Sequence, residues 1–114
     1  MVKKILFVCS GNVHRSPTAE AMFNGVKGIE ARSAGILPYS STVISKELVD
    51  WADKIFVMEE RHKQHIIERW PYVEKKIVVL NIEDVYGRNS LELKKVLKEK
   101  EPIIFGSLGL QTDG

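Results

Sequence analysis

Four short apolar runs alternate with segments of helical periodicity along the chain. The strands that these runs predict are Lys4–Val8, Glu30–Ser33, Lys54–Met58 and Lys76–Leu80. Two of the runs are almost unbroken by polar residues, which is typical of strands buried on both faces. The helices predicted after the strands are Pro17–Val26, Ser45–Trp51, Glu59–Arg69 and Leu91–Lys100. This alternation predicts an α/β fold of three layers, with a parallel sheet between helices.

Two segments do not fit the alternation. Residues 35–45 form a loop that contains Ser and Pro, with Tyr39 near its middle, and we expect this loop to border a site. Residues 105–114 contain three glycines and show no periodicity, so we predict a poorly ordered tail and assign it no function. A chain of 114 residues can bury one hydrophobic core. We therefore expect a single domain over residues 1–104, followed by the tail.

The composition excludes several classes of protein. A hydrophobic content of 44% and a charged content of 28% are typical of a globular protein. The net charge of +2 is too small to favour a nucleic-acid partner, and no apolar run approaches the roughly 20 residues that cross a bilayer. The N-terminus lacks a signal-peptide core, and one cysteine cannot form an internal disulfide. We expect a cytoplasmic protein without membrane or nucleic-acid partners.

The single cysteine, Cys9, lies at the end of the first predicted strand and begins a short loop. The sequence from this residue is Cys9-Ser10-Gly11-Asn12-Val13-His14-Arg15-Ser16-Pro17. We predict that a helix starts after the loop, with Ser16 as N-cap and Pro17 at the first helical position. A strand, a tight loop and a helix N-terminus direct backbone N–H groups at one point, which predicts an anion site.

This loop pairs a nucleophile with a guanidinium group. A thiol in an anion site loses its proton readily, and thiolate is the reactive form of cysteine. Arg15, six residues after Cys9, can hold two oxygens of a tetrahedral oxyanion in a fork. Gly11 and Asn12 both tolerate positive φ, which an inward-curled loop requires. The alternative interpretation is a buried structural cysteine before an ordinary strand-to-helix turn.

A proton donor for a leaving group is found after the fourth predicted strand. Asp84 lies just beyond that strand, so it belongs to the same sheet edge as Cys9. It can protonate a leaving oxygen and later deprotonate a water molecule. A loop Asp that forms an Asx turn or caps the last helix is an equally good interpretation. Glu83 is the nearest competitor, and neighbouring side chains in an extended segment point apart.

These residues resemble the low-molecular-weight protein tyrosine phosphatases, in particular a short branch labelled predicted tyrosine phosphatases. The matching segments, in order, are the loop Cys9–Pro17, Ser33-Ala34-Gly35, Ala52-Asp53, Val57-Met58 and Asp84-Val85-Tyr86. The resemblance extends to about Lys100 and implies a four-stranded parallel sheet of order 2-1-3-4, a flavodoxin-like or phosphotyrosine phosphatase I-like fold.

The resemblance also implies a role for each site residue. Cys9 attacks phosphorus and becomes a phosphocysteine, Asp84 acts as acid and then base, and Ser16 donates a hydrogen bond to the sulfur. Asn12 supports the loop. The residues implied to bind phosphate are Ser10, Gly11, Asn12, Val13, His14, Arg15 and Ser16. The family needs no metal and no cofactor, because the loop amides and Arg15 supply the positive field. The implied partner is a phosphorylated protein or a small aryl phosphate, and we expect a monomer.

The chain also departs from the family pattern. His14 stands where members often have a second cysteine; it either raises the local positive potential or faces solvent without a role. The acid segment has Val85 where the family has Pro. The segment after Gly35 is short and lacks the Trp that walls the substrate site. Tyr39 and Tyr86 are then the candidate aromatic walls.

One weaker cluster and several alternative functions are also consistent with the sequence. Glu59, His62 and His65 have helical spacing that could mimic a metal cluster, and a solvated helix face is the favoured interpretation. An arsenate reductase that uses an external thiol and a non-catalytic phosphate-binding domain are alternative functions. A phosphocysteine carrier is disfavoured because it does not need Arg15. The sequence therefore predicts a metal-independent phosphomonoesterase that acts on aryl phosphates, with protein phosphotyrosine as the expected substrate.

Overall fold

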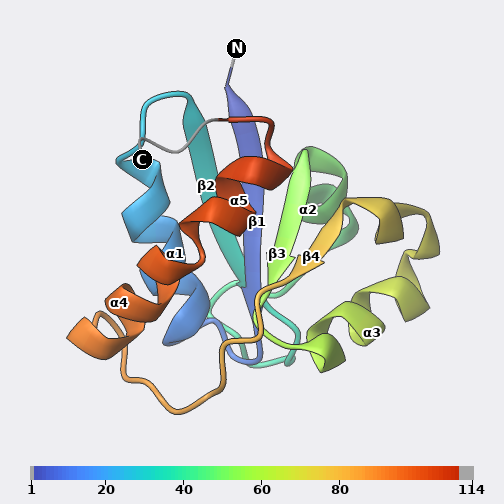
Figure 1. The fold of residues 1–114 in the computed structure, drawn as a ribbon. Coiled ribbons are helices and arrows are strands. Elements are labelled where there is room, and N and C mark those ends of the chain that lie inside the picture. Colours follow the sequence, from blue (N-terminus) through green and yellow to red (C-terminus); the bar gives the residue numbers. More distant parts are fainter. Residues whose placement is uncertain (1, 111–114) are drawn as a thin grey trace.

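A four-stranded parallel sheet forms the centre of the computed structural model, which describes residues 2–110 (Figure 1). The strands are β1 (Lys3–Cys9), β2 (Ile29–Gly35), β3 (Lys54–Val57) and β4 (Ile77–Val79). Their order is β2-β1-β3-β4, and every pair is parallel. The predicted sheet and its order are confirmed. Because all strands run the same way, their carboxyl ends lie at one edge of the sheet.

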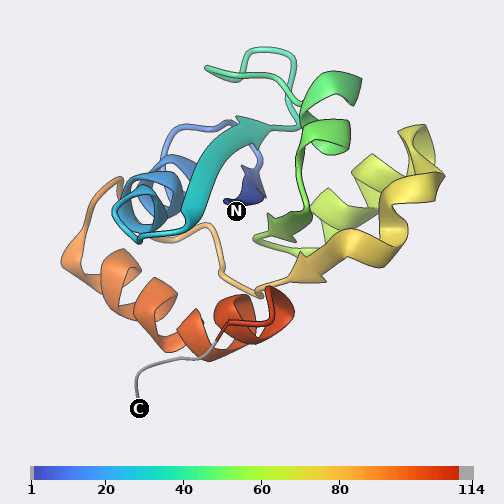
Figure 2. The ribbon, with the colours of Figure 1, turned by 90° about the horizontal axis from the view of Figure 1, so that it is seen from above.

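Helices cover both faces of this sheet (Figures 1 and 2). One face is covered by α1 (Arg15–Asn24), α4 (Leu91–Glu99) and α5 (Glu101–Ser107). The other is covered by α2 (Lys46–Trp51), α3 (Glu60–Arg69) and the 3₁₀ helix η1 (Pro71–Lys76). The three-layer architecture is therefore confirmed. Within residues 2–110, no helix has the length and apolar character needed to cross a membrane.

The strand residues alternate between two hydrophobic cores. Ile5 and Phe7 of β1 face the core under α1, α4 and α5, whereas Leu6 and Val8 face the core under α2 and α3. All four side chains are fully buried. Burial on both faces explains why the first strand reads as an unbroken apolar run. Phe7 and Phe23 of α1 pack with ring centroids 5.4 Å apart.

The start of α1 differs from the prediction. The helix begins at Arg15, and His14 rather than Ser16 occupies the N-cap position, without a side-chain cap bond. The Ser16 hydroxyl is not available for capping, because it lies 3.0 Å from Cys9 Sγ and accepts a hydrogen bond from Asn12 Nδ2. The Ser16 side chain therefore bonds to residues of the loop instead of capping the helix.

The C-terminal segment also differs from the prediction. Helix α5 crosses the expected boundary at residue 104, with Pro102 in its first turn. Phe105 packs edge-on against Phe23 with centroids 5.8 Å apart, and Leu108 is buried in the same core. The predicted tail is thus wrong at its start, since these apolar side chains complete the core beside α4. Residues 111–114 of the predicted tail lie outside the described residues.

Candidate active site

A pocket of about 230 Å³ opens at the carboxyl edge of the sheet, above the loop between β1 and α1. Three chain segments contribute to it: the loop itself, the segment after β2 and the segment after β4. The lining residues are Cys9, Ser10, Gly11, Val13, His14, Arg15, Leu37, Tyr39 and Asp84. Cys9, Arg15 and Asp84, which the sequence analysis singled out, are therefore brought together.

Asn12 determines the curvature of the loop. Its φ of 56° is left-handed, a conformation that Asn tolerates better than most residues. The side-chain amide donates to Ser16 Oγ and to Ser33 Oγ, both at 2.9 Å, and its oxygen accepts from the Thr42 backbone N–H at 3.1 Å. Gly11 has no positive φ. The positive φ angle expected in this loop is thus found at Asn12 and not at Gly11.

Gly35, at the end of β2, lets the loop lie against the sheet. A Cβ atom here would lie 2.3 Å from Ser40 Oγ, 2.7 Å from the Ser10 carbonyl oxygen and 2.8 Å from the Asn12 backbone nitrogen. These separations are far shorter than van der Waals contacts, so only glycine fits. The absence of a side chain at this position allows three segments to meet beneath the pocket.

Cys9 is the nucleophile candidate, and its sulfur has a directed hydrogen-bond partner. The residue is 3% exposed, and Sγ lies 3.0 Å from Ser16 Oγ. Asn12 Nδ2 can only donate to Ser16, so the serine proton remains free to point at the sulfur. The competing acceptor, the Ala34 carbonyl, is more distant at 3.4 Å.

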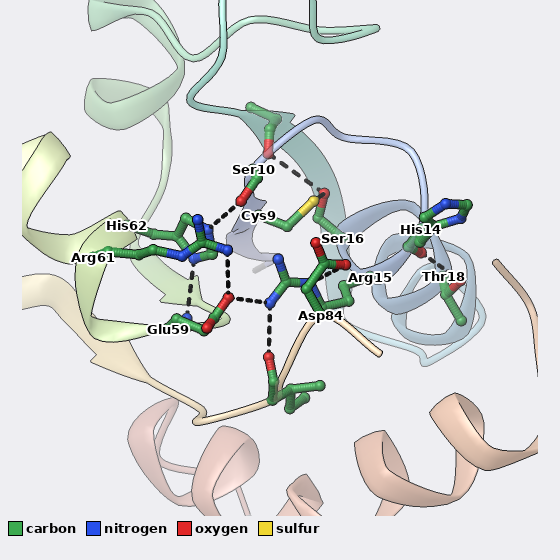
Figure 3. Close-up of polar contacts among 12 residues, drawn as sticks. Cys9, Ser10, His14, Arg15, Ser16, Thr18, Glu59, Arg61, His62 and Asp84 are labelled. Carbon is green, nitrogen blue, oxygen red and sulfur yellow. Dashed lines mark hydrogen bonds and ion pairs between the residues drawn. The ribbon is translucent and has the colours of Figure 1, made fainter. Parts of the chain in front are cut away.

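Arg15 is buried and held in one orientation (Figure 3). Its Nη1 donates to Glu59 Oε2 at 2.6 Å and to the Ile82 carbonyl at 2.8 Å. These two bonds use both protons of Nη1. Among the described residues, the edge formed by Nε and Nη2 makes no hydrogen bond and has an ion-pair contact with Asp84; this edge has the parallel donors that bind two oxygens. Asp84 Oδ1 lies 3.6 Å from Nε.

Glu59 lies between two guanidinium groups. Its Oε2 accepts from Arg15 and also from Arg61 Nη2 at 2.9 Å. Partial burial alone would raise the pKa of Glu59, but the hydrogen bonds from the two arginines outweigh it, and the net pKa is lowered. Glu59 is therefore an anion that neutralises and orients Arg15.

His62 has contacts that the sequence analysis did not anticipate. The residue is fully buried, its Nδ1 accepts from the Glu59 backbone N–H at 3.0 Å, and its Nε2 lies 3.0 Å from Ser10 Oγ. Burial and then the charges of Arg15 and Arg61 lower the pKa of His62 to about 4. The predicted solvated face is wrong for His62. Within residues 2–110, no His, Cys, Asp and Glu side chains gather in a group that could hold a metal ion.

In the segment after β4, Asp84 lines the pocket, whereas Glu83 and Tyr86 do not. Asp84 lines the pocket, and its side chain is 54% exposed. Glu83 is exposed and does not line the pocket. Tyr86 packs, partly buried, against the core under α4. The expectation that Tyr86 walls the pocket is therefore corrected, because this ring gains burial in the core instead.

Two further expected residues lie at the mouth of the pocket. Tyr39 lines it and is 79% exposed, so this ring is free to contact a bound molecule. His14 belongs to the lining, but its side chain is exposed and turned away from Cys9 and Arg15 (Figure 3). Its carbonyl accepts a hydrogen bond from Thr18 Oγ1 at 2.7 Å. The geometry thus gives the His14 imidazole no contact with the nucleophile.

Comparisons with known proteins agree with this geometry. The family model for low molecular weight phosphotyrosine protein phosphatase matches residues 4–43. The chain is 32% identical to a protein-arginine-phosphatase of Geobacillus stearothermophilus over 70% of each chain. It is 30% identical to the low molecular weight protein-tyrosine-phosphatase Ptp of Acinetobacter johnsonii, over 74% of this chain and 80% of the relative. The solved structure of a low molecular weight protein tyrosine phosphatase from T. tengcongensis matches with a TM-score of 0.71 and 28% identity, over 93% of this chain and 97% of that one.

Proposed function

Since the chain belongs to the low molecular weight phosphotyrosine protein phosphatase family and is thus a hydrolase, we propose that it hydrolyses phosphomonoesters through a phosphocysteine on Cys9. The observation that supports this most directly is the shared pocket of Cys9 and the free edge of Arg15. Because both residues line one pocket, a phosphoryl group bound by that edge would share the pocket with the Cys9 sulfur. We propose protein phosphotyrosine as the substrate.

In the first step, the Cys9 thiolate attacks phosphorus, an S–P bond forms and the P–O bond to the leaving oxygen breaks. Asp84 gives its proton to that oxygen, so the product leaves as a neutral hydroxyl. The Nε and Nη2 protons of Arg15 bind the equatorial oxygens, over which charge spreads in the transition state. The buried Arg15–Glu59 pair keeps this edge fixed before the substrate arrives.

In the second step, a water molecule attacks the phosphocysteine. Asp84, now a carboxylate, takes the proton of the water as the new P–O bond forms and the S–P bond breaks. The electron pair of the S–P bond returns to sulfur. The Ser16 hydroxyl, 3.0 Å from Sγ, stabilises the departing thiolate, and phosphate is released.

The apolar mouth of the pocket supports an aromatic substrate. Val13, Leu37 and Tyr39 line it around the loop. A planar ring can pack against these side chains while its phosphate reaches Arg15, and stacking against Tyr39 adds attraction. The exposure of Val13 and Tyr39 suits a phosphorylated side chain presented by a protein.

Protein phosphoarginine is a second candidate substrate, because two relatives, 32% and 29% identical, are named protein-arginine-phosphatase. Asp84 is the carboxylate in the lining that could accept hydrogen bonds from a substrate guanidinium. The relatives are phosphatases, so they do not favour the arsenate reductase or the non-catalytic alternative.

Hydrolysis of p-nitrophenyl phosphate in EDTA, followed by competition between two peptides, tests the proposal. We expect the wild-type protein to be active and Cys9→Ser to be inactive, while Ser107→Ala, far from the pocket, serves as the control. Two peptides of one sequence, with phosphotyrosine or phosphoarginine, are then compared by kcat/KM. A higher value for phosphoarginine would replace phosphotyrosine as the substrate, and activity of Cys9→Ser at the wild-type rate would overturn the mechanism.

A further inference from the structure

Ser10 follows the nucleophile and presents a hydroxyl group at the pocket wall. Its backbone is fixed from the opposite side, because its carbonyl accepts from the Leu37 N–H at 3.0 Å and from Ser40 Oγ at 3.2 Å. The side chain is in turn bonded to His62 Nε2 at 3.0 Å. Both ends of the residue are thus held by segments far away in the sequence.

The direction of the Ser10–His62 bond follows from the other ring nitrogen. The Glu59 backbone N–H donates to His62 Nδ1, so Nδ1 bears no proton. A neutral imidazole then has its proton on Nε2, which must donate to Ser10 Oγ. The ring stays neutral at pH 7, because burial and the charges of Arg15 and Arg61 lower the pKa of His62 to about 4.

This assignment leaves the Ser10 proton unused. The hydroxyl oxygen accepts from His62, and residues 2–110 provide no acceptor for its O–H. Ser10 lines the pocket, and Arg15, whose Nε and Nη2 donors make no hydrogen bond among residues 2–110, lines it as well. A free O–H donor on the wall of a pocket that suits a phosphoryl group has an obvious acceptor in the oxygens of that group.

We propose that the Ser10 hydroxyl donates a hydrogen bond to the phosphoryl group bound in the pocket, and that His62 is the residue that positions it. The identity of the bound group rests on the proposed function. Ser10 touches the substrate, whereas His62 acts only through Ser10.

The N-terminus of α3 then holds the pocket at two places. Glu59 and His62 form a capping box, in which the Glu59 backbone N–H donates to His62 Nδ1 at 3.0 Å and the His62 backbone N–H donates to the Glu59 carbonyl at 3.0 Å. From this box Glu59 reaches Arg15, at the far end of the loop, and His62 reaches Ser10, at its beginning. One turn of helix therefore positions both a charged and a neutral donor at the same pocket; Figure 3 shows the bonds from Glu59 to Arg15 and from His62 to Ser10.

Orthovanadate binding, measured by calorimetry, tests this proposal without requiring turnover. We expect Ser10→Ala to weaken binding about tenfold, the loss of one hydrogen bond to a charged group. His62→Asn places an oxygen where Nδ1 was, so this variant keeps the hydrogen bond from the Glu59 backbone N–H. It loses the hydrogen bond to Ser10, so it should weaken orthovanadate binding as much as Ser10→Ala does. His62→Gln places a donor where Nε2 was and should bind within about twofold of the wild-type protein.

The remaining variants distinguish the loss of Ser10 positioning by His62 from a general loss of folded structure. The double variant Ser10→Ala/His62→Asn should bind no more weakly than Ser10→Ala alone, because both changes remove one bond. His65→Asn, on the same helix outside the pocket, is the control and should bind like the wild-type protein. Thermal unfolding should show the reverse order at position 62, since His62→Gln loses the capping bond that His62→Asn keeps.

Wild-type affinity in Ser10→Ala would overturn the proposal, and so would equal weakening by His62→Asn and His62→Gln. A wild-type protein that binds orthovanadate but hydrolyses no phosphomonoester would contradict the proposed function, while the Ser10 comparison would still decide the present proposal. Absence of orthovanadate binding to the wild-type protein would contradict both.

Discussion

The carboxylate of Glu59 and the guanidinium of Arg15 form a 2.6 Å ion pair beside the pocket, 44 residues apart in the sequence. Arg15 is 1% exposed and Glu59 is 29% exposed. A buried guanidinium without a partner is costly, so this pair both permits the burial of Arg15 and fixes its free edge. Two of the expected effects below, at Glu59 and at His62, depend on how α3 and the loop meet.

Glu59→Gln should impair both catalysis and stability. The neutral amide leaves Arg15 with the weaker charge partner, the half-exposed Asp84 carboxylate at 3.6 Å, so we expect kcat/KM to fall at least tenfold and the free energy of unfolding to fall by about 2 kcal/mol. Steady-state kinetics and urea unfolding measure the two effects. Glu60→Gln, an exposed change in the next residue, should alter neither; equal effects at both positions would contradict the role of the pair.

Gly35→Ala should disrupt the loop although it adds only a methyl group. The new Cβ would lie within 3 Å of atoms of Ser10, Asn12 and Ser40. We expect a loss of about 2 kcal/mol in the free energy of unfolding and a large loss of activity. Gly87→Ala, where a Cβ meets nothing within 4 Å, is the matched control and should change stability by less than about 0.5 kcal/mol. A tolerated Gly35→Ala would show that the loop does not need this close approach.

Asp84→Asn should affect substrates according to their leaving groups. Phenyl phosphate needs a proton on its leaving oxygen more than p-nitrophenyl phosphate does. We therefore expect kcat to fall about 100-fold for phenyl phosphate and distinctly less for p-nitrophenyl phosphate. Glu83→Gln, next to Asp84 but outside the pocket lining, should leave both rates unchanged. An equal fall for both substrates in Asp84→Asn would remove Asp84 as the acid.

Stability should decrease with acid through His62. The pKa of this residue is about 4 in the folded chain, against an ordinary value of 6.5. Above pH 6.5 neither state binds the proton, so the folded state has its full stability. Between pH 6.5 and 4 only the unfolded chain binds the proton, and stability falls by about 1.4 kcal/mol per pH unit, up to about 3 kcal/mol.

Urea unfolding at pH 7.5 and pH 5 measures this dependence. From the same arithmetic we expect the wild-type protein to lose about 2 kcal/mol between these values, and His62→Asn to lose distinctly less. His65→Asn is the control and should retain most of the wild-type dependence. The same loss in wild type and His62→Asn would contradict the buried neutral imidazole.

The sequence was sufficient for the sheet and for residues that follow directly from its topology. Cys9 and Asp84 lie after the first and fourth strands, and parallel strands bring their carboxyl ends to one edge. The same rule would have found Glu59, which follows the third strand. Its position at the start of an amphipathic helix instead suggested a solvated face, since periodicity cannot show that a helix end meets a loop.

The missed features depend on contacts between distant residues. His62 bonds to Ser10 across 52 positions, and no local pattern distinguishes it from an exposed helix residue. Local preference favours Ser16 as an N-cap residue. In the folded chain its hydroxyl contacts the Cys9 sulfur instead. Helix α5 contains Gly106, which weakens its helical signal, and Phe105 packs on Phe23 only in the folded chain.

Rapid-quench trapping of the phosphoenzyme tests whether Cys9 carries the phosphoryl group during turnover. The wild-type protein is mixed with p-nitrophenyl phosphate, quenched within one turnover, digested and analysed by mass spectrometry. We expect one added phosphoryl group on the peptide that contains Cys9, formed at least as fast as steady-state turnover. Turnover without such an adduct, or a phosphoryl group on another residue that forms at the catalytic rate, would contradict the proposed mechanism.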